Sequence, residues 1–271
     1  MMTMCLPCAE GNDQQDMNMF RSTVDSDSCF KAAEDDTSSQ VSTELGNDAT
    51  GTSQRLHDGA DDLAWPAYCQ NLIIFDWDDT LFPTTWLHQQ GLLKEDAEVS
   101  EEQGVQLQAL ASLVATTLDA AKRRSAVSIV TNAEHGWVEL SCRTFMPTLQ
   151  AHLLDINIVS ARTRHEQHGL VAPTTWKCLA FEEVVGEFFS VPDGAGVAAR
   201  RNIISIGDSE HEMDALKWVA NGTECYAKSV KFVQKPCVEQ LMEQHELVAR
   251  SVDDVVDHGG NLDCEVGLED I

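Results

Sequence analysis

The sequence is poor in positive charge. It has 18 lysines and arginines against 45 aspartates and glutamates, which gives a formal net charge of −27. A chain of this charge repels a phosphate backbone, so we do not expect it to bind nucleic acid non-specifically. The same field disfavours anionic membranes and small anionic substrates at long range. A phosphate-binding site in this chain would therefore need locally placed cations or a metal ion.

Long apolar runs are also missing. No window reaches the roughly 18 apolar residues of a membrane-spanning helix. The first five residues, Met1 to Cys5, lack the charged head and apolar stretch of a secretory signal. The nine cysteines are an odd number and most stand singly inside apolar runs, as reduced thiols do. We therefore expect a protein without a membrane span that resides in the cytoplasm, with the nucleus as the alternative.

The N-terminal quarter of the chain has few aromatic residues and no sustained apolar period. It holds polar clusters such as residues 25–28 and 35–39, which are rich in Asp, Ser and Thr. Such a segment cannot bury enough apolar surface to offset its chain entropy. We predict a disordered acidic segment over residues 1–62, a folded domain over residues 63–250 and an acidic C-terminal tail over residues 251–271.

Within the folded domain, short apolar runs end abruptly in polar or acidic residues. Their length and β-branched content are typical of buried strands. The runs are residues 72–75, 127–130, 156–159 and 203–206, with a fifth strand predicted at 224–227. Apolar residues at helical spacing lie in residues 107–121, 137–145, 181–188 and about 236–250. Strands that alternate with helices predict an α/β fold, a Rossmann-like three-layer sandwich around a mostly parallel sheet.

In such a sheet, ligands bind outside the carboxyl ends of the strands, where Asp76, Thr131 and Asp208 are expected. Asp76 and Asp78 stand two residues apart directly after a strand, so both could face one cation. Two neighbouring carboxylates are costly without positive charge, and Mg²⁺ with oxygen ligands is a usual solution. One carboxylate could attack phosphorus while the other protonates the leaving oxygen. The alternative is an ordinary acidic turn after a strand.

Residues 76–83, DWDDTLFP, resemble the first motif, DxDxT, of the haloacid dehalogenase superfamily, in particular a capless, lineage-restricted variety. Three further elements follow in the order of that family. They are Thr131, Lys177 and the segment Gly207-Asp208-Ser209-Glu210-His211-Glu212. The resemblance covers about residues 72–228 and implies a phosphatase-like protein that depends on Mg²⁺.

The resemblance also implies roles for single residues. Asp76 would be the nucleophile that forms an aspartyl-phosphate, and Asp78 the acid that later serves as base for the hydrolytic water. The Thr131 hydroxyl would hold a phosphoryl oxygen, and Lys177 would neutralise the nucleophile and the phosphoryl charge. A dehalogenase would use the same nucleophile on carbon and would need neither the second Asp nor a metal.

The metal would be held by the carboxylates of Asp76 and Asp208 and by the backbone carbonyl of Asp78. Three further residues in or beside the motifs are expected to contact these groups and orient them without binding the metal directly: Glu212, Ser209 and Asn132. Two positions depart from the family pattern. Asp79 stands where many members have Gly, and Glu212 stands where Asp is commoner.

Arg162 and Arg164 follow the third predicted strand in an otherwise acidic protein. They could contact an anionic group of the substrate, or they could lie in a solvated turn.

The intervals between the motifs leave room only for a flap at about residues 83–103 and not for a cap domain. An uncapped site would favour a phosphoprotein or another bulky phosphoester as substrate. The alternatives are a small-metabolite phosphatase and a catalytically silent or weak protein with a regulatory or binding role.

Overall fold

The structure of the protein is a computed structural model that describes residues 69–94, 96–166, 172–190 and 200–266. The predicted disordered segment, residues 1–62, lies outside the described residues. None of the described helices combines the length and the apolar character that crossing a bilayer requires.

The centre of the fold is a sheet of six parallel strands in the order β3-β2-β1-β4-β5-β6. The strands are β1 (Cys69–Phe75), β2 (Ala126–Thr131), β3 (Asn157–Ser160), β4 (Arg200–Gly207), β5 (Tyr226–Lys231) and β6 (Leu262–Glu265). The two central strands, β1 and β4, are lined up over their length, with Ile73 beside Ile204. Both of these side chains are fully buried, as expected for strands covered on two faces.

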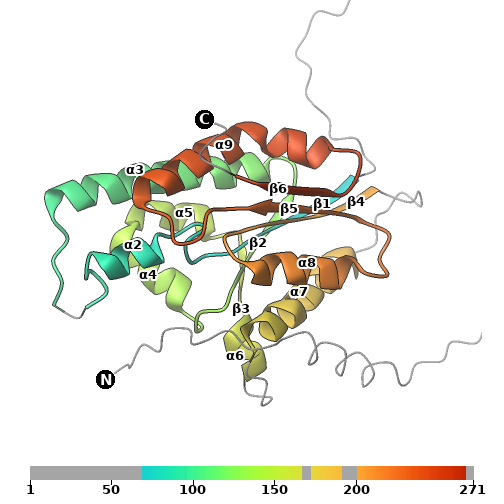
Figure 1. Ribbon diagram of the computed structural model, residues 1–271, viewed down its shortest axis with the longest axis horizontal. Coiled ribbons are helices and arrows are strands. Elements are labelled where there is room, and N and C mark those ends of the chain that lie inside the picture. The colour runs from blue at the N-terminus through green and yellow to red at the C-terminus, as the bar shows by residue number, and fades with distance from the viewer. Residues whose placement is uncertain (1–68, 95, 167–171, 191–199, 267–271) are drawn as a thin grey trace, which may run out of the picture. The chain divides into compact units, whose positions relative to one another are not determined.

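Helices cover both faces of this sheet (Figure 1). On one face α3 (Glu101–Lys122) packs along α9 (Val238–Asp257), and on the other α7 (Pro173–Ser190) packs along α8 (Glu210–Ala220). The shorter helices are α2 (Thr84–Gln89), α4 (Trp137–Phe145), η1 (Pro147–Leu149), α5 (Gln150–Leu153) and α6 (Ala161–His165). The predicted α/β class and the Rossmann-like three-layer arrangement are therefore confirmed.

Several predicted elements begin or end elsewhere. The strand predicted at 224–227 is β5, which starts two residues later and runs on to Lys231. The helix predicted to end near residue 250 continues to Asp257, because Val252 and Val256 extend its buried face. Its acidic residues in this stretch face outward, where Asp257 pairs with the Arg124 guanidinium.

The acidic tail predicted over residues 251–271 belongs to the fold as far as residue 266. After α9 the chain forms β6, which pairs in parallel with β5. Asp263 and Glu265 point to solvent while Leu262 and Cys264 are half-buried. Because β6 is a short edge strand with acidic residues at alternate positions, it lacks the mostly apolar run that marks the central strands β1 and β4.

A buried lysine fixes the end of α9. Lys228 on β5 is fully buried, and its Nζ donates to the carbonyl oxygens of Val255 and Val256, at 2.8 Å each. The last carbonyls of a helix have no partner within the helix and carry partial negative charge. Lys228 therefore satisfies groups that would otherwise be buried without hydrogen bonds.

A buried histidine ties α9 to the loop after β1. His245 is fully buried, and its Nε2 lies 2.9 Å from the carbonyl oxygen of Thr80. A carbonyl only accepts, so Nε2 carries the proton and Nδ1 is free to accept from the Thr117 hydroxyl, 3.1 Å away. Burial lowers the pKa of His245 to about 4, partly opposed by the bond to Thr80.

This lowered pKa predicts acid sensitivity. Below the unfolded-state pKa of about 6.5, His245 is protonated in the unfolded chain. In the folded protein it stays neutral down to about pH 4. The stability that neutral His245 contributes is complete above about pH 6.5 and is lost as the pH falls. By about pH 5 the loss is about 2 kcal/mol. Urea unfolding at about pH 7 and pH 5 should show a smaller loss in His245→Gln than in wild type, whereas the exposed-site variant His258→Gln should lose as much as wild type. Equal losses in wild type and His245→Gln would contradict the role.

Candidate active site

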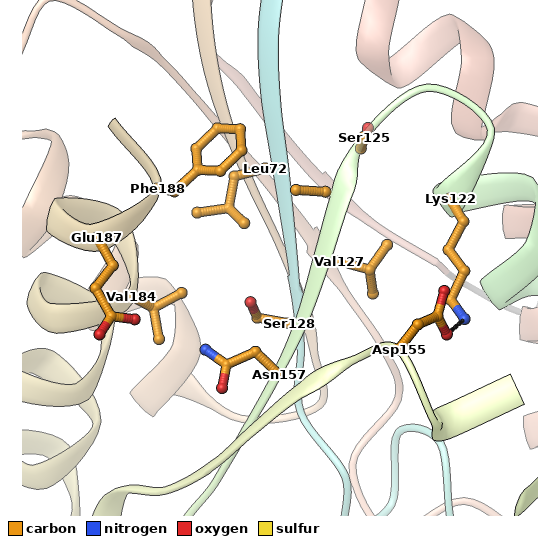
Figure 2. Close-up of a pocket in the computed structure, with 11 residues that line it drawn as sticks. Leu72, Lys122, Ser125, Val127, Ser128, Asp155, Asn157, Val184, Glu187 and Phe188 are labelled. Carbon is orange, nitrogen blue, oxygen red and sulfur yellow. Dashed lines mark hydrogen bonds and ion pairs between the residues drawn. The ribbon is translucent and has the colours of Figure 1, made fainter. Parts of the chain in front are cut away.

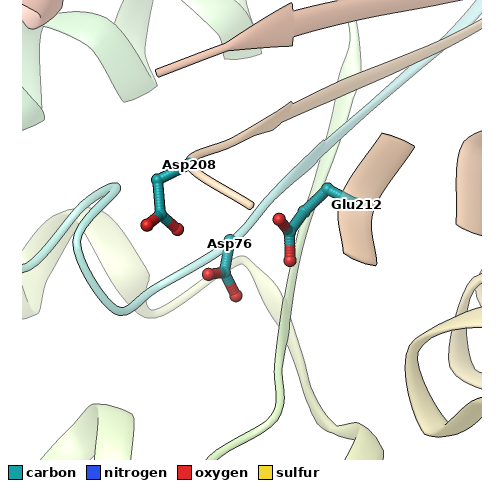
Figure 3. A group of neighbouring side chains, drawn as sticks. All are labelled: Asp76, Asp208 and Glu212. Atoms are coloured by element: carbon teal, nitrogen blue, oxygen red, sulfur yellow. The ribbon is translucent and has the colours of Figure 1, made fainter. Parts of the chain in front are cut away.

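The acidic residues of the motifs come together at the carboxyl edge of the sheet. Asp76 directly follows β1, Asp208 directly follows β4, and Glu212 lies in the first turn of α8. A carboxylate oxygen from each of the three lies within 4.8 Å of the others. Figure 3 shows the three side chains facing a common space. The first and fourth motifs, far apart in the sequence, therefore form one cluster.

Lys177 on α7 contacts two members of this cluster, Asp76 and Glu212. Its Nζ lies 2.6 Å from Asp76 Oδ1, 2.7 Å from Glu212 Oε1 and 2.9 Å from the Val130 carbonyl oxygen. The side chain is 1% exposed, so the ammonium has exchanged water for these three acceptors. An ammonium has three donors, and all three are used. Lys177 therefore holds Asp76 and Glu212 in fixed positions on either side of it.

Glu212 is held from a second side by the start of α8. Its Oε2 accepts from the backbone N–H and the hydroxyl of Ser209, at 3.0 and 2.5 Å. This is a capping box, in which Ser209 in turn accepts from the backbone of the first turn. Gly207 makes the arrangement possible, because a Cβ there would lie 2.4 Å from Glu212 Cγ. Both oxygens of Glu212 are thus occupied within the protein.

Burial sets the protonation of these carboxyl groups. It raises the pKa of Asp208 to about 9, with help from the charges of Asp76 and Glu212. It raises the pKa of Asp76 to about 7, with Lys177 opposing and Glu212 and Asp78 adding to the rise. Burial acts on Glu212 in the same direction, but the charge and hydrogen bond of Lys177 outweigh it and hold that pKa below its ordinary value.

The cluster therefore carries more potential negative charge than one lysine balances. A divalent cation is the usual remedy where carboxylates share a buried site. Asp76 and Asp208 fit this role best, since Lys177 and Ser209 occupy the oxygens of Glu212. The residues present thus suit a hard cation such as Mg²⁺, and the Asp78 carbonyl as a further ligand remains a prediction.

The loop after Asp76 is wound tightly around one carbonyl. The oxygen of Trp77 accepts from the backbone amides of Thr80, Leu81 and Phe82, at 3.3, 3.0 and 2.9 Å. Asp79 adopts φ of 55°, in the left-handed region that Gly favours and that Asp tolerates better than most residues. This explains how an aspartate occupies a position where many members of the resembled family have Gly.

Asp79 also acts as the missing cap of α2. Pro83, which precedes that helix, makes no side-chain capping bond. Asp79 supplies one from the preceding turn, with Oδ1 accepting from the Thr85 backbone N–H at 2.7 Å and Oδ2 from its hydroxyl at 2.5 Å. An acceptor at the start of a helix satisfies an otherwise unpaired donor. The predicted flap is therefore anchored directly to the first motif.

Asp78 receives hydrogen bonds from three side chains. Its Oδ1 accepts from the Thr84 hydroxyl at 2.5 Å and from Trp137 Nε1 at 2.9 Å. Its Oδ2 accepts from the Thr131 hydroxyl at 3.2 Å. Thr131 thus lies beside Asp78, although the resemblance assigns its hydroxyl to a phosphoryl oxygen. Thr84 and Trp137 were not predicted as site residues, because neither belongs to a motif.

The remaining predicted residues lie around this centre. Arg162 and Arg164 belong to α6 and not to a turn, and both have carboxylate partners. Arg162 lies 2.9 Å from Glu166, and Arg164 lies 2.6 Å from Glu183. A substrate anion would have to compete with these acids. Asn132 Oδ1 is buried without a hydrogen-bond partner among the described residues, and its orienting role remains a prediction.

Within the described residues, no cap domain stands between the motifs. The flap consists of α2 and the turns that follow, and Leu87 and Leu92 pack it into the core. A cavity of about 420 Å³ lies at the opposite edge of the sheet, where it is lined by Ala126 and Asn157 at the starts of β2 and β3 and by Phe188 near the end of α7. Figure 2 shows that cavity, whose lining residues include none of the acidic cluster.

Comparison of this chain with protein-family models, with curated proteins and with solved structures found no match in any of the three.

The acidic cluster predicts a stabilising effect of Mg²⁺ that grows with pH. With Asp208 raised to about 9, the stability linked to its proton is lost as the pH rises toward that value. A cation binds the ionised carboxylates, so it should stabilise the protein more at about pH 8 than at about pH 6. Saturation at about 100 times Kd corresponds to about 3 kcal/mol, or several degrees in Tm.

Thermal unfolding with and without millimolar Mg²⁺ at the two pH values measures this difference. Asp208→Asn should lose most of the shift, and Asp263→Asn on the exposed edge strand should keep it. A shift that is equal at both pH values, or undiminished in Asp208→Asn, would rule out a metal site at this cluster.

Proposed function

We propose that this protein is a Mg²⁺-dependent phosphomonoester hydrolase of the haloacid dehalogenase type, which works through an aspartyl-phosphate on Asp76. The observation that carries the proposal is the position of Lys177. A fully buried ammonium bridges Asp76 and Glu212 at the carboxyl edge of the sheet, with Asp208 beside them. An ordinary acidic turn has no need of a buried cation from another helix.

The environment of Asp76 suits a nucleophile. Lys177 binds Oδ1, which favours the ionised form and fixes the orientation of the carboxylate. The Asp76 backbone N–H donates to the Ile206 carbonyl at 2.9 Å, so the main chain is fixed as well. A rigid, oriented carboxylate loses little entropy on reaching the attacking geometry. When bound, Mg²⁺ would supply positive charge that offsets repulsion between this carboxylate and the phosphoryl oxygens.

Asp78 would move the protons of the reaction. It gives a proton to the leaving oxygen as Asp76 attacks phosphorus, and the carboxylate that remains then takes a proton from the water that cleaves the aspartyl-phosphate. Glu212 stays bound to Lys177 and Ser209 and keeps the lysine in place. The set of groups required for both half-reactions is present, which favours an active enzyme over a catalytically silent relative.

The nucleophile is tested with Asp76→Asn. The amide is nearly isosteric but a poor nucleophile, so kcat for 4-nitrophenyl phosphate with Mg²⁺ should fall by about 10³-fold or more. Circular dichroism should show an intact fold. Mass spectrometry of acid-quenched wild type should find a phosphoryl group on the peptide that contains Asp76. Asp263→Asn, a matched change at an exposed position, should behave as wild type. A well-folded Asp76→Asn protein with substantial turnover would remove Asp76 from the mechanism.

The open site predicts a preference for bulky substrates. Because the described part of the chain holds no cap domain between the motifs, a large phosphoester would not have to displace one to reach Asp76. We expect kcat/KM for phosphopeptides to exceed that for free sugar or nucleotide phosphates by about tenfold or more. The measurement is a panel of phosphopeptides and phosphometabolites with Mg²⁺. If kcat/KM for a small metabolite exceeds that for phosphopeptides by this margin, the preference for bulky substrates is refuted and the phosphatase proposal is not.

A further inference from the structure

The carboxylate of Asp78 accepts hydrogen bonds from three segments of the chain. Thr84 is the first residue of α2, Trp137 is the first residue of α4, and Thr131 is the last residue of β2. Two of the hydrogen bonds reach Oδ1 and one reaches Oδ2. The two oxygens of this carboxyl group are therefore not equivalent.

The difference follows from what each partner can do. An indole N–H only donates, whereas a threonine hydroxyl can donate or accept. Oδ1 accepts from the Trp137 N–H at 2.9 Å, and a carbonyl oxygen accepts a hydrogen bond better than the oxygen of a carboxylic O–H. A proton on Asp78 is therefore favoured on Oδ2, where the Thr131 hydroxyl can turn and accept. Trp137 thus favours Oδ2 as the oxygen that holds the proton of the acid.

We propose that Trp137 is a positioning residue for the general acid, which assigns the transferable proton to Asp78 Oδ2 and aims that oxygen at the leaving group. This inference rests on the proposed function. As an Asp76 oxygen bonds to phosphorus and the bond from phosphorus to the leaving oxygen breaks, the Oδ2 proton moves to the leaving oxygen. The Asp78 carboxylate that remains accepts a proton from the attacking water in the second step and is restored as phosphate departs.

The packing around Trp137 leaves its indole little freedom. Its ring meets Phe82 edge to face, with centroids 6.0 Å apart, and Phe82 stacks on Trp77 at 5.5 Å. Trp77 Nε1 in turn donates to the Ser141 hydroxyl on α4 at 3.0 Å. The loop after β1 thus donates an indole hydrogen bond to α4, and α4 donates one back to the loop. Gly136, with φ of 87°, makes the turn that brings Trp137 to this position.

The test is Trp137→Phe, which keeps an aromatic ring and removes the N–H. Serine is a poor leaving group that needs a proton, whereas 4-nitrophenolate departs with little help. We expect kcat/KM for a phosphoserine peptide to fall by about tenfold or more, as part of the 10²–10⁴ that general acids supply. The value for 4-nitrophenyl phosphate should change by about twofold or less. A merely structural role would lower both values together.

Two further variants make the test specific. Trp218→Phe removes an indole N–H that lies 3.3 Å from the Glu182 carboxylate on another face of the protein, and it should change neither value. Thr84→Val removes the other hydrogen bond to Oδ1 but leaves the Trp137 N–H in place, so it should not show the selective loss. Trp137→Leu, which also removes the N–H, serves as the deciding variant if Trp137→Phe does not fold.

The outcomes separate this inference from the proposed function. A selective loss on the phosphoserine peptide supports it. Equal losses on both substrates, or no loss, in an otherwise active enzyme overturn the role of Trp137 and leave the proposed function intact. A wild-type protein that hydrolyses neither ester with Mg²⁺ overturns the proposed function, and the role of Trp137 in proton transfer falls with it.

Discussion

The structure of the site depends on one shared ammonium group. Lys177 is buried and lies within hydrogen-bond distance of Asp76, Glu212 and a backbone carbonyl. A lone buried charge costs far more than one that is paired and hydrogen-bonded, so lysine and carboxylates require each other. Without the lysine, two ionised carboxylates would be left side by side in the interior. Without the carboxylates, the lysine would have to lose its proton or move to solvent.

The fold supplies the strict geometry that this sharing needs. The three groups come from the end of β1, from α7 and from α8, on strands and helices that pack around one sheet. Gly207 lets α8 begin close enough to β4 for Glu212 to reach the lysine. The loop after β1, which is wound around the Trp77 carbonyl, brings Asp78 within hydrogen-bond distance of Trp137 on α4. Helices therefore carry Lys177 and Glu212, while Asp76 and Asp208 directly follow the two central strands.

Much of this arrangement could be predicted from the sequence, for identifiable reasons. Strands β1, β2 and β4 are covered on both faces, so each contains a short run of mostly apolar, β-branched residues, and the polar residue after each run marks the carboxyl edge. Strand β6 could not be found in this way, since it lies at the edge of the sheet and alternates apolar with acidic residues. The role of Trp137 was hidden for another reason. A tryptophan that donates one hydrogen bond and otherwise packs in a hydrophobic cluster has the same sequence pattern as a core residue.

The order of the strands has a consequence for how the protein forms during synthesis. The first strand of the described residues, β1, lies in the middle of the sheet, and its neighbours β2 and β4 follow later in the chain and pair on either side of it. Asp76 emerges early, but Lys177 follows 101 residues later and Glu212 later still. A nascent chain therefore lacks the lysine partner of this carboxylate until 101 more residues have been made. Its charge can be buried only after α7 and α8 have left the ribosome, so the site is completed by contacts between segments distant in the sequence, which form slowly.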